Sequence, residues 1–191
     1  IEASKKRLLE FTELSLAADG GTIREIEDEK FAIHTGGNQP PRTFTLDRDL
    51  AQTEESISLL GIDHPLVSGY CQRWRNLPAT AIGASVSMPL EQTSILTVWQ
   101  VQVFGKDAET KIYIIPIAVD IDGKRIPSLE KQYQQCFHEK AVKPSLDDNQ
   151  RHELLSNHIE SSLKREMEHR GITSANTGYS ANMLSWVEVN A

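Results

Sequence analysis

The sequence predicts an α+β fold: an antiparallel β-meander packed with several helices, including a long helix near the C-terminus. Three consecutive segments rich in β-branched and aromatic residues predict the strands, at residues 81–88, 94–104 and 111–121. Stretches with apolar residues at spacings of three and four flank them and predict helices. Hydrophobic residues make up 39% of the 191 residues and charged residues 25%, as in domains that bury a core unaided. We therefore expect a single α+β domain over residues 1–191.

Residues 2–18 should form a helix, because they are good helix formers and Gly20-Gly21 follows as a stop. The five apolar side chains between Leu8 and Leu16 spread over more than half of the helix circumference. Either this helix packs on two neighbours, one of them absent from the chain, or it lies deep within its own domain. The chain has no initiator Met, so we expect a piece of a longer polypeptide, with residues 1–20 as an entry helix.

The next segment should hold two short strands and two helical starts. We expect a charged turn over residues 24–30, a strand at 31–33, a Gly- and Pro-rich loop at 36–41 and a strand at 42–46. Residues 47–51 open a turn of helix. A second helix should begin after Asp63 as N-cap, with Pro65 in its first turn, and end near residue 76.

The central strands show alternation and turn signals. Every second residue from Ile95 to Val103 should share one face. Residues 105–110 should form the hairpin loop to the next strand, and Asp122-Gly123 a tight turn. Pro116 cannot donate to a strand ladder, so it marks an edge position or a bulge.

The C-terminal third should be mainly helical. One helix is expected at residues 128–139 and a long one at 145–170, opened by a capping box of Ser145 and Asp148 and stopped by Gly171. The tail, residues 171–191, should be a loop to about residue 181, followed by a short strand at 184–189.

Charge limits the function classes. The net charge of −7 repels a phosphate backbone on average, which argues against an autonomous nucleic-acid binder and favours a basic protein partner. Cys71 and Cys136 lie far apart and belong to no CxxC pair. No apolar run approaches the roughly 18 residues of a membrane span. We expect a cytoplasmic chain with no membrane partner.

No catalytic, cofactor-binding or metal site is expected within this chain. Gly105-Lys106 and Gly123-Lys124 lack the upstream Gly and the following hydroxyl of a phosphate-binding loop. The six histidines include no HExxH pair, and Asp63-His64 has no nucleophile elbow to serve. The expected role of His64 is therefore structural, at the start of a helix.

Two short segments carry a resemblance to a known family. Residues 43–51 read TFTLDRDLA, and residues 59–67 read LLGIDHPLV. They resemble the "F-T-x-D-R-x-x-A" and "L-x-x-x-H-P-L-V" segments in the C-terminal region of bacterial Swi/Snf-type helicase-like ATPases, the group with the RNA-polymerase-associated RapA (HepA) type. Order and spacing are similar over residues 40–140.

The resemblance implies a non-catalytic accessory domain of an ATP-dependent DNA translocase. The ATPase lobes, with their ATP and Mg, would precede residue 1, and the chain would follow them as a regulatory or protein-interaction domain. The implied partners are those lobes, RNA polymerase or another protein, and double-stranded DNA through the motor. The motif positions Asp47, Arg48, Asp63, His64 and Pro65 would be structural, with Arg48 pairing with an acidic neighbour under the meander.

Two alternatives stay open. A small standalone hydrolase or nuclease would bring His64 together with at least two of Asp47, Asp49 and Asp63 in one cleft. A nucleic-acid-contacting domain of the same machine would gather seven basic residues into one patch. These are Lys5, Lys6, Arg7, Arg42, Arg48, Arg73 and Arg75.

Overall fold

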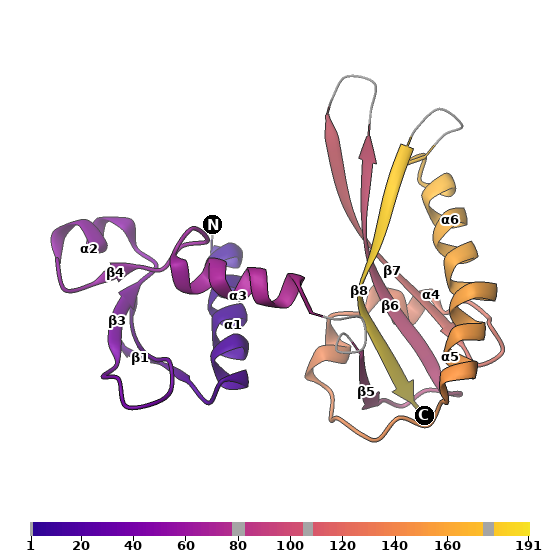
Figure 1. Ribbon diagram of the computed structural model, residues 1–191, viewed down its shortest axis with the longest axis horizontal. Helices are drawn as coiled ribbons and strands as arrows, with labels where there is room; N and C mark the ends of the chain where they lie inside the picture. Colours follow the sequence, from indigo (N-terminus) through magenta and orange to yellow (C-terminus); the bar gives the residue numbers. More distant parts are fainter. Residues whose placement is uncertain (1, 78–82, 105–108, 174–177) are drawn as a thin grey trace. The chain divides into compact units, whose positions relative to one another are not determined.

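The computed structural model describes residues 2–77, 83–104, 109–173 and 178–191 and has an α+β fold. The sequence predicts one domain over residues 1–191, whereas the structure divides into two compact units, Ile1–Leu77 and Pro78–Ala191. Each unit has a sheet and a hydrophobic core of its own. Figure 1 labels most of the helices and strands of both units.

The first unit combines a four-stranded sheet with three helices. Its sheet has the order β1-β2-β3-β4, antiparallel except for the β3–β4 pair. The strands are β1 (Thr22–Glu27), β2 (Lys30–His34), β3 (Arg42–Thr45) and β4 (Ser58–Leu59), and the helices are α1 (Glu2–Ala18), α2 (Arg48–Thr53) and α3 (Pro65–Arg75).

Most elements of this unit agree with the sequence prediction, but the charged turn at residues 24–30 was wrong. Residues 24–27 belong to β1, and the turn is confined to Asp28 and Glu29, whose φ is 59°. The error has a physical cause: apart from the half-buried Ile23, every β1 side chain is exposed. The strand is therefore held by its backbone pairing with β2 and leaves no apolar alternation in the sequence.

The core of the first unit lies between α1, α3 and the sheet. Leu16, Ile33, Phe44, Leu60, Val67 and Tyr70 are buried there. Leu14 is 67% exposed, so the wide apolar spread of α1 is only partly used within this unit. The Trp74 indole nitrogen donates to the Ser15 hydroxyl at 2.8 Å and joins α3 to α1.

The second unit is built on a sheet of order β5-β8-β6-β7. Its strands are β5 (Gly83–Ser87), β6 (Ser94–Phe104), β7 (Thr110–Asp120) and β8 (Gly178–Asn190). The β6–β7 pair is the predicted hairpin, and Pro116 lies on the edge strand β7, as predicted. Residues 105–108 of the predicted hairpin loop lie outside the described residues.

The predicted meander of three consecutive strands was wrong, because β8 lies between β5 and β6. It pairs parallel with β5 and antiparallel with β6. β8 also begins at Gly178, inside the stretch predicted as loop, and its 13 residues far exceed the short strand expected at 184–189. A register shift opposite Val98 and Trp99 interrupts its alternation, which hid the strand from the pattern of residue types.

Helices cover both faces of this sheet. α5 (Asp148–Leu154), the π-helical segment η3 (Leu155–Ile159) and α6 (Glu160–His169) cover the face that includes Ile95, Trp99 and Ile117. α4 (Pro127–Lys131) and the 3-10 helix η2 (Gln135–His138) lie over part of the other face, where Leu129 and Cys136 pack on Leu96 and Val187. Figure 1 shows α5 and α6 following each other along the sheet.

Three helix predictions for this unit need correction. The helix expected at 128–139 is two short pieces, and the one at 145–170 is three consecutive segments that begin at Asp148. The capping box is formed by Asp147 and Gln150, not by Ser145 and Asp148. Ser145 is instead engaged by a carboxylate of β8, a tertiary contact that local sequence does not encode. Gly171 ends the last segment with a φ of 67°, as predicted.

Candidate functional site

The motif residues of the first unit act as helix caps. Asp47 is the N-cap of α2: its Oδ1 accepts from the backbone N–H groups of Asp49 at 2.8 Å and Leu50 at 2.9 Å. The Leu50 and Asp49 hydrogen bonds lower the pKa of this carboxyl and outweigh the opposing effect of burial. The structural role of Asp47 is therefore that of a helix cap.

The cap of α3 lies one residue later than predicted. His64, not Asp63, is the N-cap: its Nδ1 accepts from the backbone N–H of Leu66 at 3.1 Å. Pro65 occupies the first position of the helix, where a missing N–H leaves no bond unmade. The imidazole also packs edge-on against Phe44, with ring centroids 5.2 Å apart. A histidine cap was not foreseen because Asp is the commoner N-cap residue.

The predicted pairing of Arg48 under the meander stays a prediction. Arg48 is exposed and opens α2 in the first unit. Among the ion pairs formed by the described residues, none involves Arg48.

The two alternative sites gain little from this geometry. The acceptor nitrogen of His64 and the carboxylate of Asp47 are each bonded to the start of their own helix. Of the seven basic residues, Lys5 lies 3.4 Å from Glu29, and Arg73 lies 2.6 Å from Asp19. Within the described part of the chain, no group of three or more His, Cys, Asp or Glu residues could hold a metal ion.

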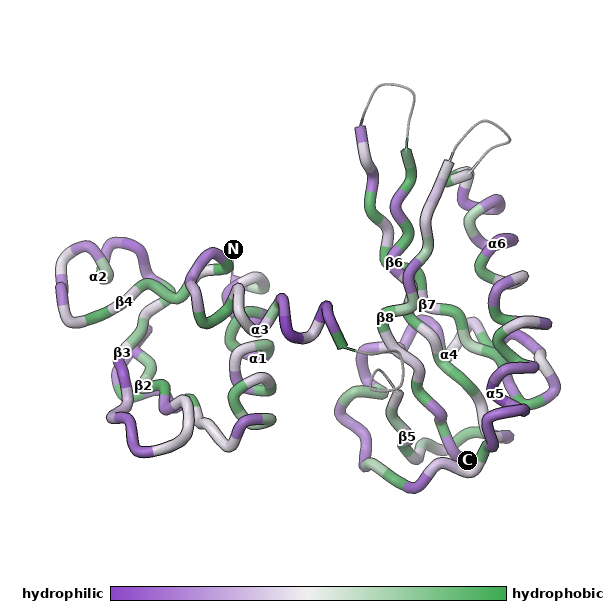
Figure 2. The backbone as a smooth tube through the Cα atoms, viewed as in Figure 1, coloured by the Kyte–Doolittle hydropathy of each residue, from purple (hydrophilic) through white to green (hydrophobic). Residues whose placement is uncertain are grey.

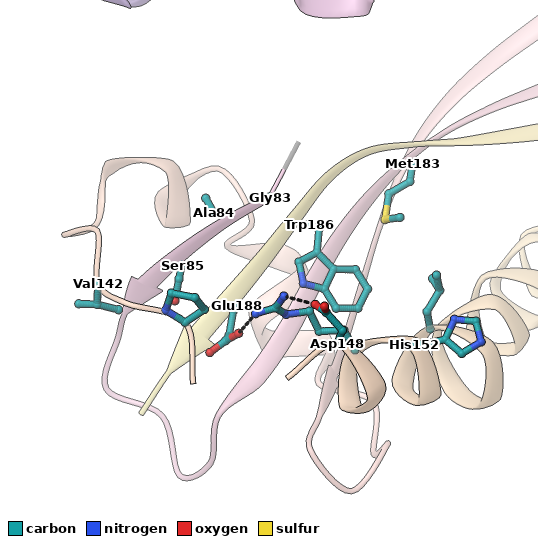
Figure 3. Close-up of a pocket in the computed structure, with 12 residues that line it drawn as sticks. Gly83, Ala84, Ser85, Val142, Asp148, His152, Met183, Trp186 and Glu188 are labelled. Atoms are coloured by element: carbon teal, nitrogen blue, oxygen red, sulfur yellow. Dashed lines mark hydrogen bonds and ion pairs between the residues drawn. The ribbon is translucent and has the colours of Figure 1, made fainter. Parts of the chain in front are cut away.

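The second unit contains a pocket of about 580 Å³ that we call the Trp186 pocket (Figure 3). It lies where β5 and β8 face the segment before α5 and the first turns of that helix. Its lining consists of Gly83, Ala84, Ser85, Val142, Pro144, Asp148, Arg151, His152, Leu155, Met183, Trp186 and Glu188.

Glu188 is the central polar group of this pocket and is only 1% exposed. Its Oε1 accepts from the Ser145 backbone N–H, from the Ser145 hydroxyl at 2.9 Å and from the Leu146 N–H at 3.2 Å. Its Oε2 has no hydrogen-bond partner among the described residues. Oε1 of this buried carboxylate therefore holds the segment before α5 in place, whereas Oε2 can still accept a hydrogen bond.

Arg151 approaches Glu188 without satisfying it. Its Nη2 lies 3.8 Å from Glu188 Oε2, an ion-pair distance but too long for a hydrogen bond. The same nitrogen donates to the Leu146 carbonyl at 2.7 Å, and Nη1 donates to Asp148 at 3.0 Å. Figure 3 draws the contacts with Glu188 and Asp148 as dashed lines.

Trp186 forms a wall of the pocket and offers a donor. Figure 3 shows its indole between Met183 and Glu188 on the same strand. Its Nε1 is buried and, within the described ranges, has no acceptor. The other two indoles are satisfied, since Trp74 donates to Ser15 and Trp99 to Thr97, each at 2.8 Å.

A second hollow of the same unit surrounds a network of ion pairs. Arg125 Nε donates to Glu130 at 2.7 Å, and its Nη2 lies 2.8 Å from Glu166. Arg170 closes the network on Glu166 at 2.6 Å. Burial would raise the pKa of Glu166, but the hydrogen bonds from Arg170 and Arg125 outweigh it and lower that pKa. This network joins α4 and α6 to the segment that follows β7.

Part of the second sheet carries exposed apolar residues, which we call the hairpin face: Phe104, Ile112 and Ile114. They are 49%, 56% and 47% exposed. The strand register places them on the same side as Gln100 and Gln102, opposite the face covered by α5 and α6. The alternation of polar and apolar residues along β6 and β7 is visible in Figure 2.

The Trp186 pocket was not predicted from the sequence. Trp186 and Glu188 were assigned to a short strand of unknown pairing, and Arg151 fell within the long helix expected at residues 145–170. The available signal was a charged residue between Val187 and Val189, where a buried strand would carry an apolar one.

Comparisons with known proteins leave the family open. No family model and no curated protein matches the chain. None of the helices in the described part of the chain is both long enough and apolar enough to cross a membrane.

Proposed function

We infer that this chain is a non-catalytic, protein-binding and regulatory part of a bacterial ATP-dependent helicase-like translocase of the Swi/Snf type, working in the cytoplasm. The family rests on the resemblance of the segments at residues 43–51 and 59–67. ATP and Mg would belong to the ATPase lobes of the parent protein, and double-stranded DNA would be contacted through those lobes. Such a machine would serve transcription or defence.

The hairpin face is the observation that carries the interaction role. Isolated apolar residues are common on protein surfaces, but Phe104, Ile112 and Ile114 lie together on a sheet that helices cover elsewhere. Burying them against a partner would recover hydrophobic free energy at about 25 cal/mol for each Å² removed from water.

The occupant that we propose for the hairpin face is the parent protein's own ATPase lobes. A motor that tracks DNA carries a basic surface, and the net charge of −7 on this chain complements it. Electrostatic attraction would orient the two parts, and the apolar residues would hold them.

The first test is double-stranded-DNA-stimulated ATP hydrolysis by the parent translocase with and without residues 1–191, with the chain alone as control. We expect the chain alone to be silent and its deletion to change the ATPase rate or its dependence on DNA. A silent chain whose deletion leaves the motor unchanged would point to recruitment of another protein, such as RNA polymerase. ATP hydrolysis by the chain alone would overturn the proposal.

A paired substitution tests the hairpin face itself. Ile112→Lys with Ile114→Lys should reproduce the effect of the deletion, because two charges would have to be desolvated at the contact. Ile121→Lys is the matched control, since Ile121 is 46% exposed just beyond the other end of β7. Thermal unfolding of the variants checks that the fold is kept. Equal effects of the pair and the control on the motor would reject this face as the contact.

A further inference from the structure

We propose that the Trp186 pocket binds the side-chain carboxamide of an Asn or Gln residue presented by a partner protein. This inference rests on the proposed function of the chain as an interaction domain, and it names the chemistry that one of its sites would recognise. Three observations on the described residues support it: an acceptor, a donor and an apolar enclosure that meet in one pocket.

The acceptor is Glu188 Oε2. The carboxylate is 1% exposed, and its other oxygen already receives three donors from Ser145 and Leu146. The Arg151 guanidinium lies 3.8 Å from this oxygen and forms an ion pair with it, but donates its hydrogen bonds to Leu146 and Asp148. A ligand N–H would complete the coordination that buried carboxylate oxygens normally have.

The donor is Trp186 Nε1, two residues before Glu188 on β8. Residues two apart on a strand point to the same face, so the indole and the carboxylate both face the pocket (Figure 3). The indole nitrogen is a donor only, and its hydrogen has no acceptor within the described part of the chain.

A carboxamide is the group that satisfies both atoms. Its NH₂ donates to Glu188 and its carbonyl accepts from Trp186. A guanidinium or ammonium group would leave the indole unpaired and would meet the charge of Arg151. A carboxylate would accept from Trp186 but would face Glu188 without a proton to share.

The rest of the lining suits the stem and backbone of such a residue. Met183, Leu155 and Pro144 supply apolar surface for methylene groups, and Gly83 and Ala84 leave room for an approaching main chain. A nucleobase edge also combines donors and acceptors, but Asp148, whose side chain is 99% exposed, and the net charge of −7 oppose its phosphates. We therefore place a polypeptide in this pocket.

The test uses the 191-residue chain labelled with ¹⁵N and two matched probes, N-acetylglutamine methylamide and N-acetylglutamate methylamide. The chain has three Trp residues, hence three indole N–H signals, and Trp186→Phe identifies the third. We expect the glutamine probe to shift the Trp186 signal saturably and the signals of Trp74 and Trp99 not at all. The glutamate probe should bind about ten-fold more weakly, the value of one hydrogen bond.

Glu188→Gln makes the test sharper because it should invert the preference. The carboxamide introduced by this substitution would keep its carbonyl oxygen towards Ser145 and Leu146 and turn its NH₂ to the pocket, which would then offer two donors. The glutamate probe should now bind more tightly than the glutamine probe. If this variant does not fold, Trp186→Phe should weaken binding of the glutamine probe about ten-fold. The signal of the Met183 methyl group, in a chain that also carries ¹³C-labelled methionine methyls, follows this binding.

Each outcome decides the proposal. Equal shifts from both probes, or no shift up to the solubility of the glutamine probe, would overturn carboxamide recognition. A tighter response to cytidine than to the glutamine probe would assign the pocket to a nucleobase instead. Failure here leaves the ATPase and hairpin-face experiments unaffected, so the pocket chemistry and the proposed function are tested separately.

Discussion

At the scale of single residues, His64 shows how a motif histidine can be structural. Its Nδ1 accepts from the Leu66 N–H, which requires that nitrogen to carry no proton. Burial lowers the pKa of His64 below its ordinary value of 6.5. The unfolded chain therefore binds a proton more readily than the folded chain, and folding favours the neutral ring.

This arrangement predicts a pH dependence for the first unit. The contribution of His64 is fully present above pH 6.5 and is lost as the pH falls through the lower pKa of the folded state. At neutral pH, His64→Ala should lower the free energy of unfolding by about 1 kcal/mol, the usual value of a cap. His64→Asn keeps an acceptor and should be milder.

Urea unfolding followed by Trp74 fluorescence measures this, in a background with Trp99→Phe and Trp186→Phe. The His64→Asn variant is the control, because it keeps the cap without a group that titrates near neutral pH. If acid below pH 6.5 destabilises this variant as much as the chain that retains His64, the histidine cap is not the cause.

At the scale of elements, the turn after β7 is fixed by local and tertiary contacts together. Asp120 Oδ1 accepts from the N–H groups of Asp122 and Lys124, each at 2.9 Å. Gly123 has a φ of 80°, and a Cβ at this position would clash with the imidazole of His158 in η3. The tight turn that Asp-Gly predicts is therefore also a packing contact with the helical layer.

Gly123 and Gly171 should differ in how strongly substitution by alanine destabilises the second unit. Gly171→Ala should lower the free energy of unfolding by about 1 kcal/mol, because Gly171 also has a positive φ but open space around its Cβ. Gly123→Ala should lower it by about 1–3 kcal/mol more, the usual range for overpacking. Thermal unfolding of the second unit measures both. His158→Ala should recover part of the Gly123→Ala loss, and no recovery would contradict the contact.

The strands of the second unit differ in how well the sequence pattern predicted them. β6 and β7 were predicted with bounds close to those observed, because their apolar residues alternate and a turn signal joins them. β8 was largely missed, although it is central in the sheet. Its register shift and its polar residues disrupt the alternation, and its stability comes from pairing with two strands far away in sequence. Such pairing is absent from any local window.

At the scale of the whole molecule, two cores replace the expected one. The first unit buries residues between Leu16 and Tyr70, and the second buries two clusters on opposite faces of its sheet. Composition allowed a single core for 191 residues, and nothing at the boundary near Leu77-Pro78 distinguishes a linker from the end of a helix.

Separate cores predict that each unit folds by itself. Residues 1–77 and 78–191, expressed separately, should each unfold cooperatively on heating, the first with lower stability because a 77-residue unit buries a smaller fraction of its surface. Circular dichroism measures the transitions. Leu16→Ala in the first fragment and Leu163→Ala in the second should each lower the free energy of unfolding by about 2–5 kcal/mol. A non-cooperative melt of either fragment would contradict this division.

The helix caps depend on contacts between residues close together in the sequence, whereas the Trp186 pocket depends on contacts between distant segments. The caps at Asp47 and His64 lie within three residues of the groups that they bind, so the motif residues were found from the sequence, and only the exact cap of α3 was misplaced. The Trp186 pocket joins residues near 84, 144, 151 and 186, and its polar groups gain meaning only where those segments meet.

The sequence was enough to predict the α+β class, the β6–β7 hairpin, most helix starts and the helical stop at Gly171, because periodicity, caps and turn residues act over a few residues. The place of β8, the division into two units and the burial of Glu188 were found only in the three-dimensional structure. These depend on contacts between segments up to about a hundred residues apart, such as Asn190 with Ser85. Their free energy comes from desolvation and pairing that no local pattern records.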